Sequence, residues 1–114
     1  MKLGHIEIMA TDPGASRRFY ETLGFELVVI QGEGAFVWMG LGDGEILLRR
    51  GEPPAPAKSY REGPVALVLY VDSLDAELAR LAAAGLAPVD HDGDGCPLFR
   101  DPDGNWIQVV EPPT

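Results

Sequence analysis

The chain has 114 residues, of which 46% are hydrophobic and 24% charged, which suffices for a single compact domain (1–114) with its own core but hardly for two. Nine basic residues against eighteen acidic ones give a formal net charge of -9, which argues against nucleic acid and anionic membranes as partners and favours a cationic ligand. A single cysteine, Cys96, excludes an intramolecular disulfide and a thiolate zinc cluster.

The first half of the chain predicts the order βαβββ. Residues 3–10 alternate polar and apolar side chains, as a half-buried strand does. A helix begins at Asp12 and Pro13 and ends before Gly24. Three strands follow, separated by turn signals, at residues 25–30, 35–41 and 45–50. This first module spans 1–50, and because no stretch approaches the roughly 18 apolar residues of a membrane span, we expect a cytoplasmic protein.

A linker at residues 51–64 separates this module from a second one. It carries four prolines and no hydrophobic period, so we expect it to cross the surface. Asp72 or Ser73 then caps a helix that runs to Ala84, and Gly85 ends it. The strands of this half are expected at residues 65–71, 88–90, 96–100 and 105–111. The second module, 65–114, therefore repeats the order βαβββ.

The two halves repeat at a nearly constant offset. Asp12 maps to Asp72 at an offset of 60, and Gly24 maps to Gly85 at 61. With His5 in the first strand, and with the segments HIEIMATDPGASRRFYETLGFELV, LVLYVDSLDAELARLAAAGL and FRDPDGNWIQVVEP, the chain resembles the vicinal oxygen chelate superfamily over nearly its whole length. That superfamily includes glyoxalase I, extradiol dioxygenases, fosfomycin-resistance enzymes and bleomycin-resistance proteins.

This resemblance implies an α+β fold whose two modules form a curved mixed sheet with a U-shaped cleft, often completed across a homodimer. It also implies a divalent metal, held by the first and last strands of each module. His5 and Gln108 stand at two of those positions. The other two positions carry apolar side chains that cannot bind a metal: Ala66 or Val65, and Leu48 or Leu47. Because an amide is a poor metal donor, we expect no cofactor, with a divalent metal at His5 and Gln108 as the alternative.

The depleted metal position favours a binding protein over a metalloenzyme. We expect a non-metal protein of the glyoxalase/bleomycin-resistance type that sequesters an aromatic or cationic compound, such as an antibiotic, in an apolar cleft. The predicted ligand-binding residues are His5, Glu7, Met9, Leu48, Ala66, Val68, Tyr70, Trp106 and Gln108, which share the cleft face of their strands, and Trp38 near the rim of the cleft.

Two enzymatic alternatives stay open. One is a glyoxalase- or dioxygenase-like metalloenzyme with an atypical ligand set that includes His5 and Gln108. The other is a lyase or isomerase that works without metal, with His5 and Glu7 as the candidate catalytic residues.

The run DHDGDG raises a separate hypothesis. The spacing of its aspartates and Asp101 fits a calcium-binding loop. However, Asp101 stands where the bidentate glutamate is usual, and the flanking segments predict strands where a helix–loop–helix calcium site has helices. A solvated hairpin loop with an exposed His91 is the competing interpretation.

Overall fold

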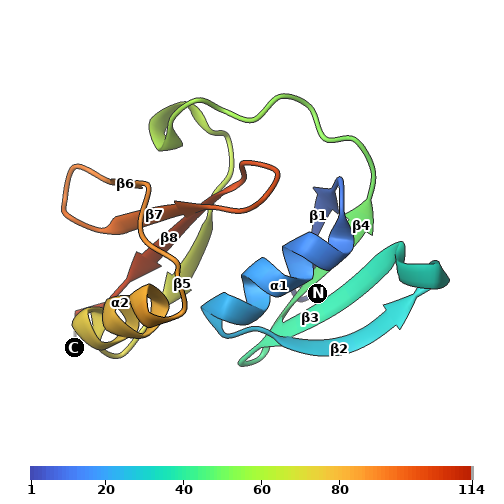
Figure 1. Ribbon diagram of the computed structural model, residues 1–114, viewed down its shortest axis with the longest axis horizontal. Coiled ribbons are helices and arrows are strands. Elements are labelled where there is room, and N and C mark those ends of the chain that lie inside the picture. The colour runs from blue at the N-terminus through green and yellow to red at the C-terminus, as the bar shows by residue number, and fades with distance from the viewer. Residues whose placement is uncertain (114) are drawn as a thin grey trace. The chain divides into compact units, whose positions relative to one another are not determined.

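The chain folds into two units, Met1–Ala55 and the residues from Pro56 onward, in a computed structural model that describes residues 1–113. Each unit holds one four-stranded mixed sheet and one α-helix, in the order βαβββ (Figure 1). The α+β fold class and the repeated module are therefore confirmed. Within residues 1–113, no helix has the length and apolar character needed to cross a membrane.

The first unit has the strand order β1-β4-β3-β2, with β1 parallel to β4 and the other pairs antiparallel. A two-residue turn between Leu41 and Gly44 sets the register of β3 against β4, so that Trp38 lies opposite Leu47. The elements are β1 (Ile6–Ala10), α1 (Pro13–Leu23), β2 (Glu26–Gln31), β3 (Phe36–Leu41) and β4 (Gly44–Arg50).

Helix α1 begins and ends where local chemistry dictates. The Asp12 carboxylate accepts hydrogen bonds from the backbone N–H groups of Gly14 and Ala15, and Pro13 occupies the first turn. Gly24, with φ 117°, adopts the left-handed conformation that ends the helix. The helix packs on β3 and β4, and the fully buried side chains of this core include Ala10, Tyr20, Met39 and Leu48.

The second unit has the matching strand order β5-β8-β7-β6. Its elements are β5 (Leu67–Tyr70), α2 (Leu74–Ala83), β6 (Asp90–His91), β7 (Pro97–Arg100) and β8 (Trp106–Val110). Ser73, rather than Asp72, caps α2, by accepting a hydrogen bond from the N–H of Ala76. The buried side chains of this unit include Leu69, Leu81, Phe99, Ile107 and Val109.

The predicted strand boundaries needed small corrections. The first strand begins at Ile6 rather than at residue 3, because its pairing with β4 starts there. The strand predicted at residues 65–71 is confined to β5, at Leu67–Tyr70, where β8 offers a partner. The strand predicted at residues 88–90 is β6, which pairs Asp90 with Leu98 and exposes His91, as expected. The predicted linker also folds in part, into a 3-10 helix at Tyr60–Glu62.

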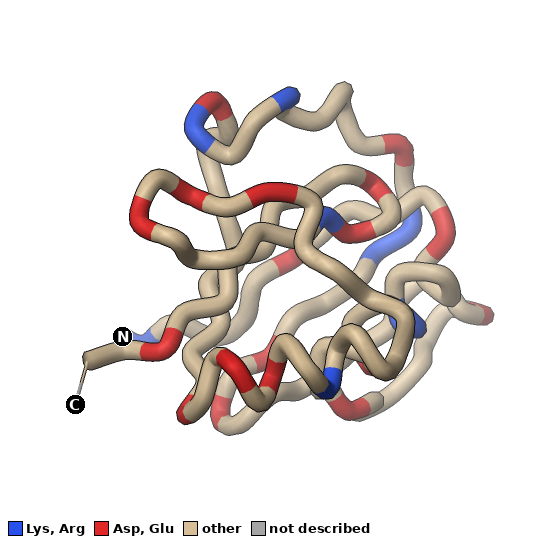
Figure 2. The backbone as a smooth tube through the Cα atoms, turned by 60° about the vertical axis from the view of Figure 1, so that its left-hand side comes forward, with Lys and Arg blue, Asp and Glu red and all other residues tan. Residues whose placement is uncertain are grey.

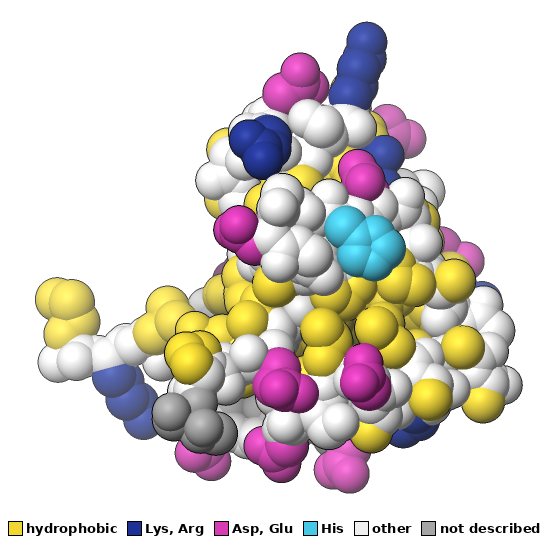
Figure 3. Space-filling model, turned by 90° about the vertical axis from the view of Figure 1, so that its left-hand side faces the viewer, with side chains coloured by type: hydrophobic (Ala, Val, Ile, Leu, Met, Phe, Trp, Pro, Cys, Tyr) yellow, Lys and Arg dark blue, Asp and Glu magenta, His cyan; other side chains and the backbone are white. Residues whose placement is uncertain are grey.

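Acidic residues outnumber basic ones by eighteen to nine, and they are found in all parts of the chain. Figure 2 shows Asp and Glu along helices, strands and connections. On the face that Figure 3 displays, acidic side chains border an area of hydrophobic ones. The net charge of -9 is therefore spread over the surface instead of being confined to one segment.

Candidate functional site

The face of the first sheet that α1 leaves uncovered carries polar and aromatic side chains. In the register of this sheet Glu7 lies beside Leu47, and Leu47 lies beside Trp38. Because side chains alternate along strands, these three share a face, and His5 and Arg49 share it by the same parity. We call His5, Glu7, Trp38 and Arg49 the His5 cluster.

The members of the His5 cluster contact one another in a chain. His5 Nε2 lies 3.3 Å from Glu7 Oε2, and Arg49 Nε lies 3.2 Å from Glu7 Oε1. The His5 and Trp38 rings meet edge to face, with centroids 4.7 Å apart. Trp38 Nε1 in turn donates a hydrogen bond of 3.1 Å to Gln31 Oε1. The side chains of the cluster are thus oriented by their neighbours.

The His5 cluster stays accessible to solvent. The side chains of His5, Glu7 and Arg49 are 32%, 50% and 40% exposed. When Nε2 of His5 carries the proton and donates a hydrogen bond to Glu7 Oε2, Nδ1 is left as an acceptor. The cluster therefore offers an aromatic surface, an acceptor, a carboxylate and a guanidinium to a small molecule.

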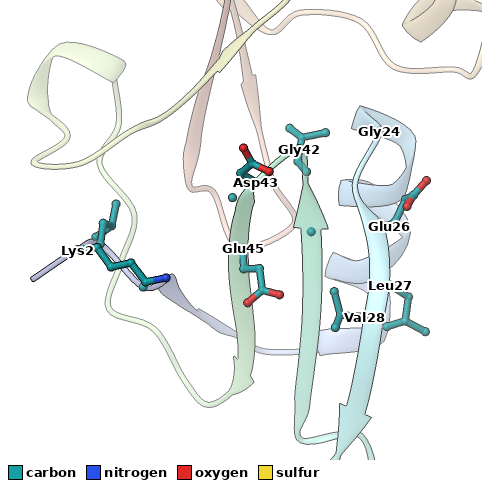
Figure 4. Close-up of a pocket in the computed structure, with 13 residues that line it drawn as sticks. Lys2, Gly24, Glu26, Leu27, Val28, Gly42, Asp43 and Glu45 are labelled. Carbon is teal, nitrogen blue, oxygen red and sulfur yellow. The ribbon is translucent and has the colours of Figure 1, made fainter.

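An open groove of about 880 Å³ lies at the end of the same sheet. The pairing of β1 with β4 begins at Ile6 and Ile46, and the groove residue Glu45 comes directly before Ile46 on β4. Figure 4 shows Lys2 extending toward Glu45, whereas Glu26 and Leu27 project from β2 on the other side. Its lining contains three acidic side chains and one basic one, namely Glu26, Asp43, Glu45 and Lys2. The groove thus favours a positively charged group.

In the second unit, Gln108 is buried, and both its amide oxygen and its amide nitrogen make a hydrogen bond. Its Oε1 accepts a hydrogen bond of 3.3 Å from the Tyr60 hydroxyl, and its Nε2 donates to Asp92 Oδ2. The amide oxygen already accepts from Tyr60 and carries no carboxylate charge, so it is a weak donor for a metal ion. Gln108 therefore does not fit the role of a metal ligand.

Trp106 is also covered by its own unit. Its indole N–H donates a hydrogen bond of 3.1 Å to the backbone oxygen of Ala57, and the Arg100 guanidinium lies 4.5 Å from the centroid of its ring. Only 6% of Trp106 is exposed. The side chain predicted to line an open cleft is thus packed beneath the linker.

The aspartates of the DHDGDG run serve the hairpin itself. Asp92 Oδ1 accepts hydrogen bonds from the N–H groups of Asp94 and Cys96, both at 2.8 Å. The Cys96 N–H is the main reason why the pKa of Asp92 lies below its ordinary value, while burial and the nearby Asp92 charge raise the pKa of the Cys96 thiol. The Asp101 carboxylate accepts hydrogen bonds from the backbone N–H groups of Asp103 and Asn105 and from the side-chain amide of Asn105.

These contacts favour a structured hairpin over a calcium loop. Among residues 1–113, no three His, Cys, Asp or Glu side chains are grouped closely enough to hold a metal ion.

The structure distributes the predicted ligand-binding residues unevenly. His5, Glu7 and Trp38 lie together, and Met9 shares their face by parity. Leu48 does not lie on this face, because it is fully buried on the opposite face, which α1 covers. Leu47, the alternative residue at this position, lies beside Glu7 instead. In the second unit Gln108 pairs with Val68, a pairing that matches Glu7–Leu47 at an offset of 61 and Ile8–Leu48 at an offset of 60. Val68 and Tyr70 on β5 are exposed, and Ala66, which comes just before β5, is half-buried.

Sequence reasoning missed the residues that hold these side chains in place. Arg49 was not selected, although the two-residue turn after Leu41 fixes a register that puts it on the face of Trp38. Gln31 was missed because it lies at a strand end. Tyr60 and Arg100 were missed because no local pattern predicts a linker that folds back on β8.

Comparison with known proteins places the chain in a broad group. The profile of the Glyoxalase/Bleomycin resistance protein/Dioxygenase superfamily matches residues 2–109. A search of curated proteins found no match. The solved structure of TnmS3, an antibiotic binding protein from Streptomyces sp. CB03234, is 27% identical with a TM-score of 0.70, and the alignment covers 99% of each chain.

Two further structures show the breadth of the likeness. An integron cassette protein from the mobile metagenome of V. Cholerae is 29% identical, with a TM-score of 0.63, over 96% of this chain and 95% of that one. Lactoylglutathione lyase from Agrobacterium tumefaciens is 23% identical, with a TM-score of 0.70, over 96% of this chain and 92% of the lyase. At this identity the lyase shows the fold alone.

Proposed function

Because the chain belongs to the Glyoxalase/Bleomycin resistance protein/Dioxygenase superfamily, we propose that it binds and sequesters a small aromatic or cationic compound without a metal. The observation that carries this proposal is the His5 cluster, in which imidazole, indole, carboxylate and guanidinium groups converge on an open sheet face. Such a mixture of flat apolar surface and a few oriented polar groups is typical of small-molecule sites.

Two further observations support the ligand class. The acidic groove at the end of the same face favours a cation, and the Trp38 ring offers a surface on which a cation or an aromatic ring can stack. TnmS3, at 27% identity, is an antibiotic binding protein. We therefore extend the proposal to antibiotic-like compounds that are aromatic, cationic or both.

The proposal is tested by screening matched aromatic compounds that carry a positive, neutral or negative substituent, read by thermal shift and tryptophan fluorescence. We expect a cationic or neutral aromatic compound to bind, and Trp38→Ala to weaken binding at least about fivefold, because stacking on an aromatic face contributes about 1 kcal/mol or more. A panel without any binder would sink the proposal.

Glu7 and Glu21 provide a matched pair of variants. Each is a half-exposed glutamate beside an arginine, with Glu7–Arg49 at 3.2 Å on the candidate face and Glu21–Arg17 at 3.5 Å on α1. Glu7→Gln is expected to change the affinity for a cationic compound, whereas Glu21→Gln is expected to leave it unchanged. Equal effects of the two would mean that net charge alone governs binding.

The metal-free part of the proposal needs its own measurement. Elemental analysis of protein purified without chelator is expected to find no stoichiometric transition metal. A stoichiometric metal would instead favour a metalloenzyme that uses His5. Turnover that survives chelation and disappears in His5→Ala would favour the metal-independent enzyme with His5 and Glu7.

We further propose that the protein acts as a cytoplasmic homodimer. The apolar side chains of β2 are unusually open for an edge strand, with Val28 54% and Ile30 44% exposed. A second copy that covers this strand would remove them from water. Light scattering of the wild type and of Val28→Asp tests this: a dimer that the substitution weakens is expected, and a monomeric wild type would overturn it.

A further inference from the structure

The linker residues 56–63, which we call the strap, bind the sheet of their own unit through a few polar contacts. The backbone oxygen of Ala57 accepts from Trp106 Nε1 and from Arg100 Nη2, both at 3.1 Å. The Tyr60 hydroxyl donates to Gln108 Oε1 at 3.3 Å. Trp106 and Gln108 are consequently only 6% and 9% exposed.

The residues of the strap are more exposed to solvent than the Trp106 and Gln108 side chains that they cover. All of its residues are exposed or half-buried, so none is locked into the core. Internal contacts give it a shape of its own: Ser59 Oγ accepts from the Glu62 N–H at 3.3 Å, and the Gly63 N–H bonds to the Tyr60 oxygen at 3.2 Å. A segment with local structure and few buried contacts can open as a piece at low cost.

The fit is close where the strap crosses the sheet. A side chain at Gly104, which has φ +87°, would approach Pro56 within 2.8 Å, and one at Gly63 would lie 3.5 Å from Trp106. The backbone of the strap thus lies directly against the indole ring.

We propose that the strap is a displaceable occupant of a second ligand-binding position, on Trp106, Arg100 and Gln108. This inference rests on the proposed function and deepens it by naming a ligand class. A ligand that replaces the strap must bring an oxygen acceptor for the indole and guanidinium N–H groups, and a hydroxyl donor for the Gln108 oxygen, because buried groups left without partners oppose binding. The class is a hydroxylated aromatic compound with a carbonyl or carboxylate oxygen.

The strap also sets the apparent affinity. Only molecules in which it has opened can bind, so the measured Kd is the intrinsic Kd divided by the open fraction. Loosening the strap without altering Trp106, Arg100 or Gln108 should therefore tighten binding. Tyr60→Phe does this, since it removes one hydroxyl and leaves the site itself intact.

The experiment uses the full chain carrying Trp38→Phe, in which Trp106 is the remaining tryptophan. The NMR signal of its indole N–H is followed on addition of 4-hydroxyacetophenone or 4-hydroxybenzoate, with 4-methoxyacetophenone as the probe that lacks the hydroxyl donor. We expect the hydroxylated probes to shift the signal and the methoxy probe to bind at least about fivefold more weakly. Tyr60→Phe should speed hydrogen exchange of the indole N–H and tighten binding at least about twofold.

Lys58→Ala is the matched control, because Lys58 is an exposed strap residue, and it should change neither exchange nor affinity. A probe that binds wild-type protein while shifting only the Trp38 signal would overturn the strap inference and leave the proposed function standing. Faster exchange in Tyr60→Phe without tighter binding would also overturn the inference. If neither these probes nor the aromatic panel binds, both proposals fall.

Discussion

At the scale of single residues, Gln108 shows how an apparently misplaced polar group is accommodated in a buried strand. Its oxygen accepts from Tyr60 and its nitrogen donates to Asp92, which also accepts from two backbone N–H groups. A glutamate could accept from Tyr60 but would direct its second oxygen at the Asp92 carboxylate. An amide is the group that satisfies both neighbours.

Gln108→Glu should therefore destabilise the fold in a pH-dependent way. The pKa of Asp92 in the wild type is lowered chiefly by the Cys96 N–H, so its contribution to stability is present above the ordinary carboxyl pKa and is lost as the pH falls through the lowered value. In the variant two carboxylates face each other, which raises the pKa of the pair. We expect the free energy of unfolding of the variant to lie below that of the wild type at about pH 7, and the difference to shrink by about pH 5, as measured by urea unfolding.

A second substitution tests the cause. Asn in place of Asp92 keeps an oxygen for the backbone N–H groups of Asp94 and Cys96 and offers its own N–H₂ group to the carboxylate introduced at position 108. The pair Gln108→Glu with Asp92→Asn should recover most of the stability lost at neutral pH. Failure of this rescue would place the cost in packing instead of charge repulsion.

At the scale of the elements, the two modules begin their helices with different chemistry. Asp12 accepts from two backbone N–H groups at the start of α1. At the start of α2, Ser73 accepts a hydrogen bond from one backbone N–H group. The Glu111 carboxylate accepts a second one, from the N–H of Leu74 at 2.8 Å. Helix α2 therefore shares its capping between a local residue and the C-terminal segment.

This difference predicts unequal effects of removing the two caps. Asp12→Ala should cost about 1–2 kcal/mol, because two N–H groups lose their acceptor and the helix dipole loses a negative charge. Ser73→Ala should cost about 0.5–1 kcal/mol, since Glu111 still serves α2. Adding Glu111→Gln to Ser73→Ala should deepen the loss, and urea unfolding of the variants measures all three. A larger effect for Ser73→Ala alone would contradict this account.

The elements could be predicted from the sequence because their ends are set locally. Asp12, Pro13 and Gly24 mark α1 without reference to the rest of the chain, and the predicted helix was confirmed at both ends. The strand faces were harder to predict. A fixed offset of 60 selects Leu48, yet the pairing of Glu7 with Leu47 places Leu48 under α1, since a shift of one residue moves a side chain to the opposite face.

In the candidate sites, too, features set by local sequence could be predicted and those set by distant contacts could not. The shared face of His5 and Glu7 could be predicted, because alternation along a strand is a local pattern. The cover on Trp106 could not, since Trp106 donates to Ala57, 49 positions away, and Tyr60 donates to Gln108, 48 positions away. The binding hypothesis stays a prediction, whereas membership of the superfamily is established.

At the scale of the whole molecule, carboxylates far outnumber the groups that can neutralise them. Eighteen acidic residues face nine basic ones, and ion pairs such as Glu7–Arg49 and Glu77–Arg80 each neutralise only one of them. Like charges spread over a small surface repel one another and oppose the compact state. The same field attracts cations to the groove that Glu26, Asp43 and Glu45 line.

Salt should consequently stabilise this protein. Screening lengths fall from about 20 Å at low salt to about 7 Å at about 0.2 M, so repulsion between surface carboxylates weakens more than the short ion pairs do. We expect the free energy of unfolding at neutral pH to rise by about 0.5–1 kcal/mol over that range. Sodium chloride and choline chloride should act alike if screening is the cause. A rise with sodium alone would point to a bound cation, and a fall with both would mean that ion pairs outweigh the net repulsion.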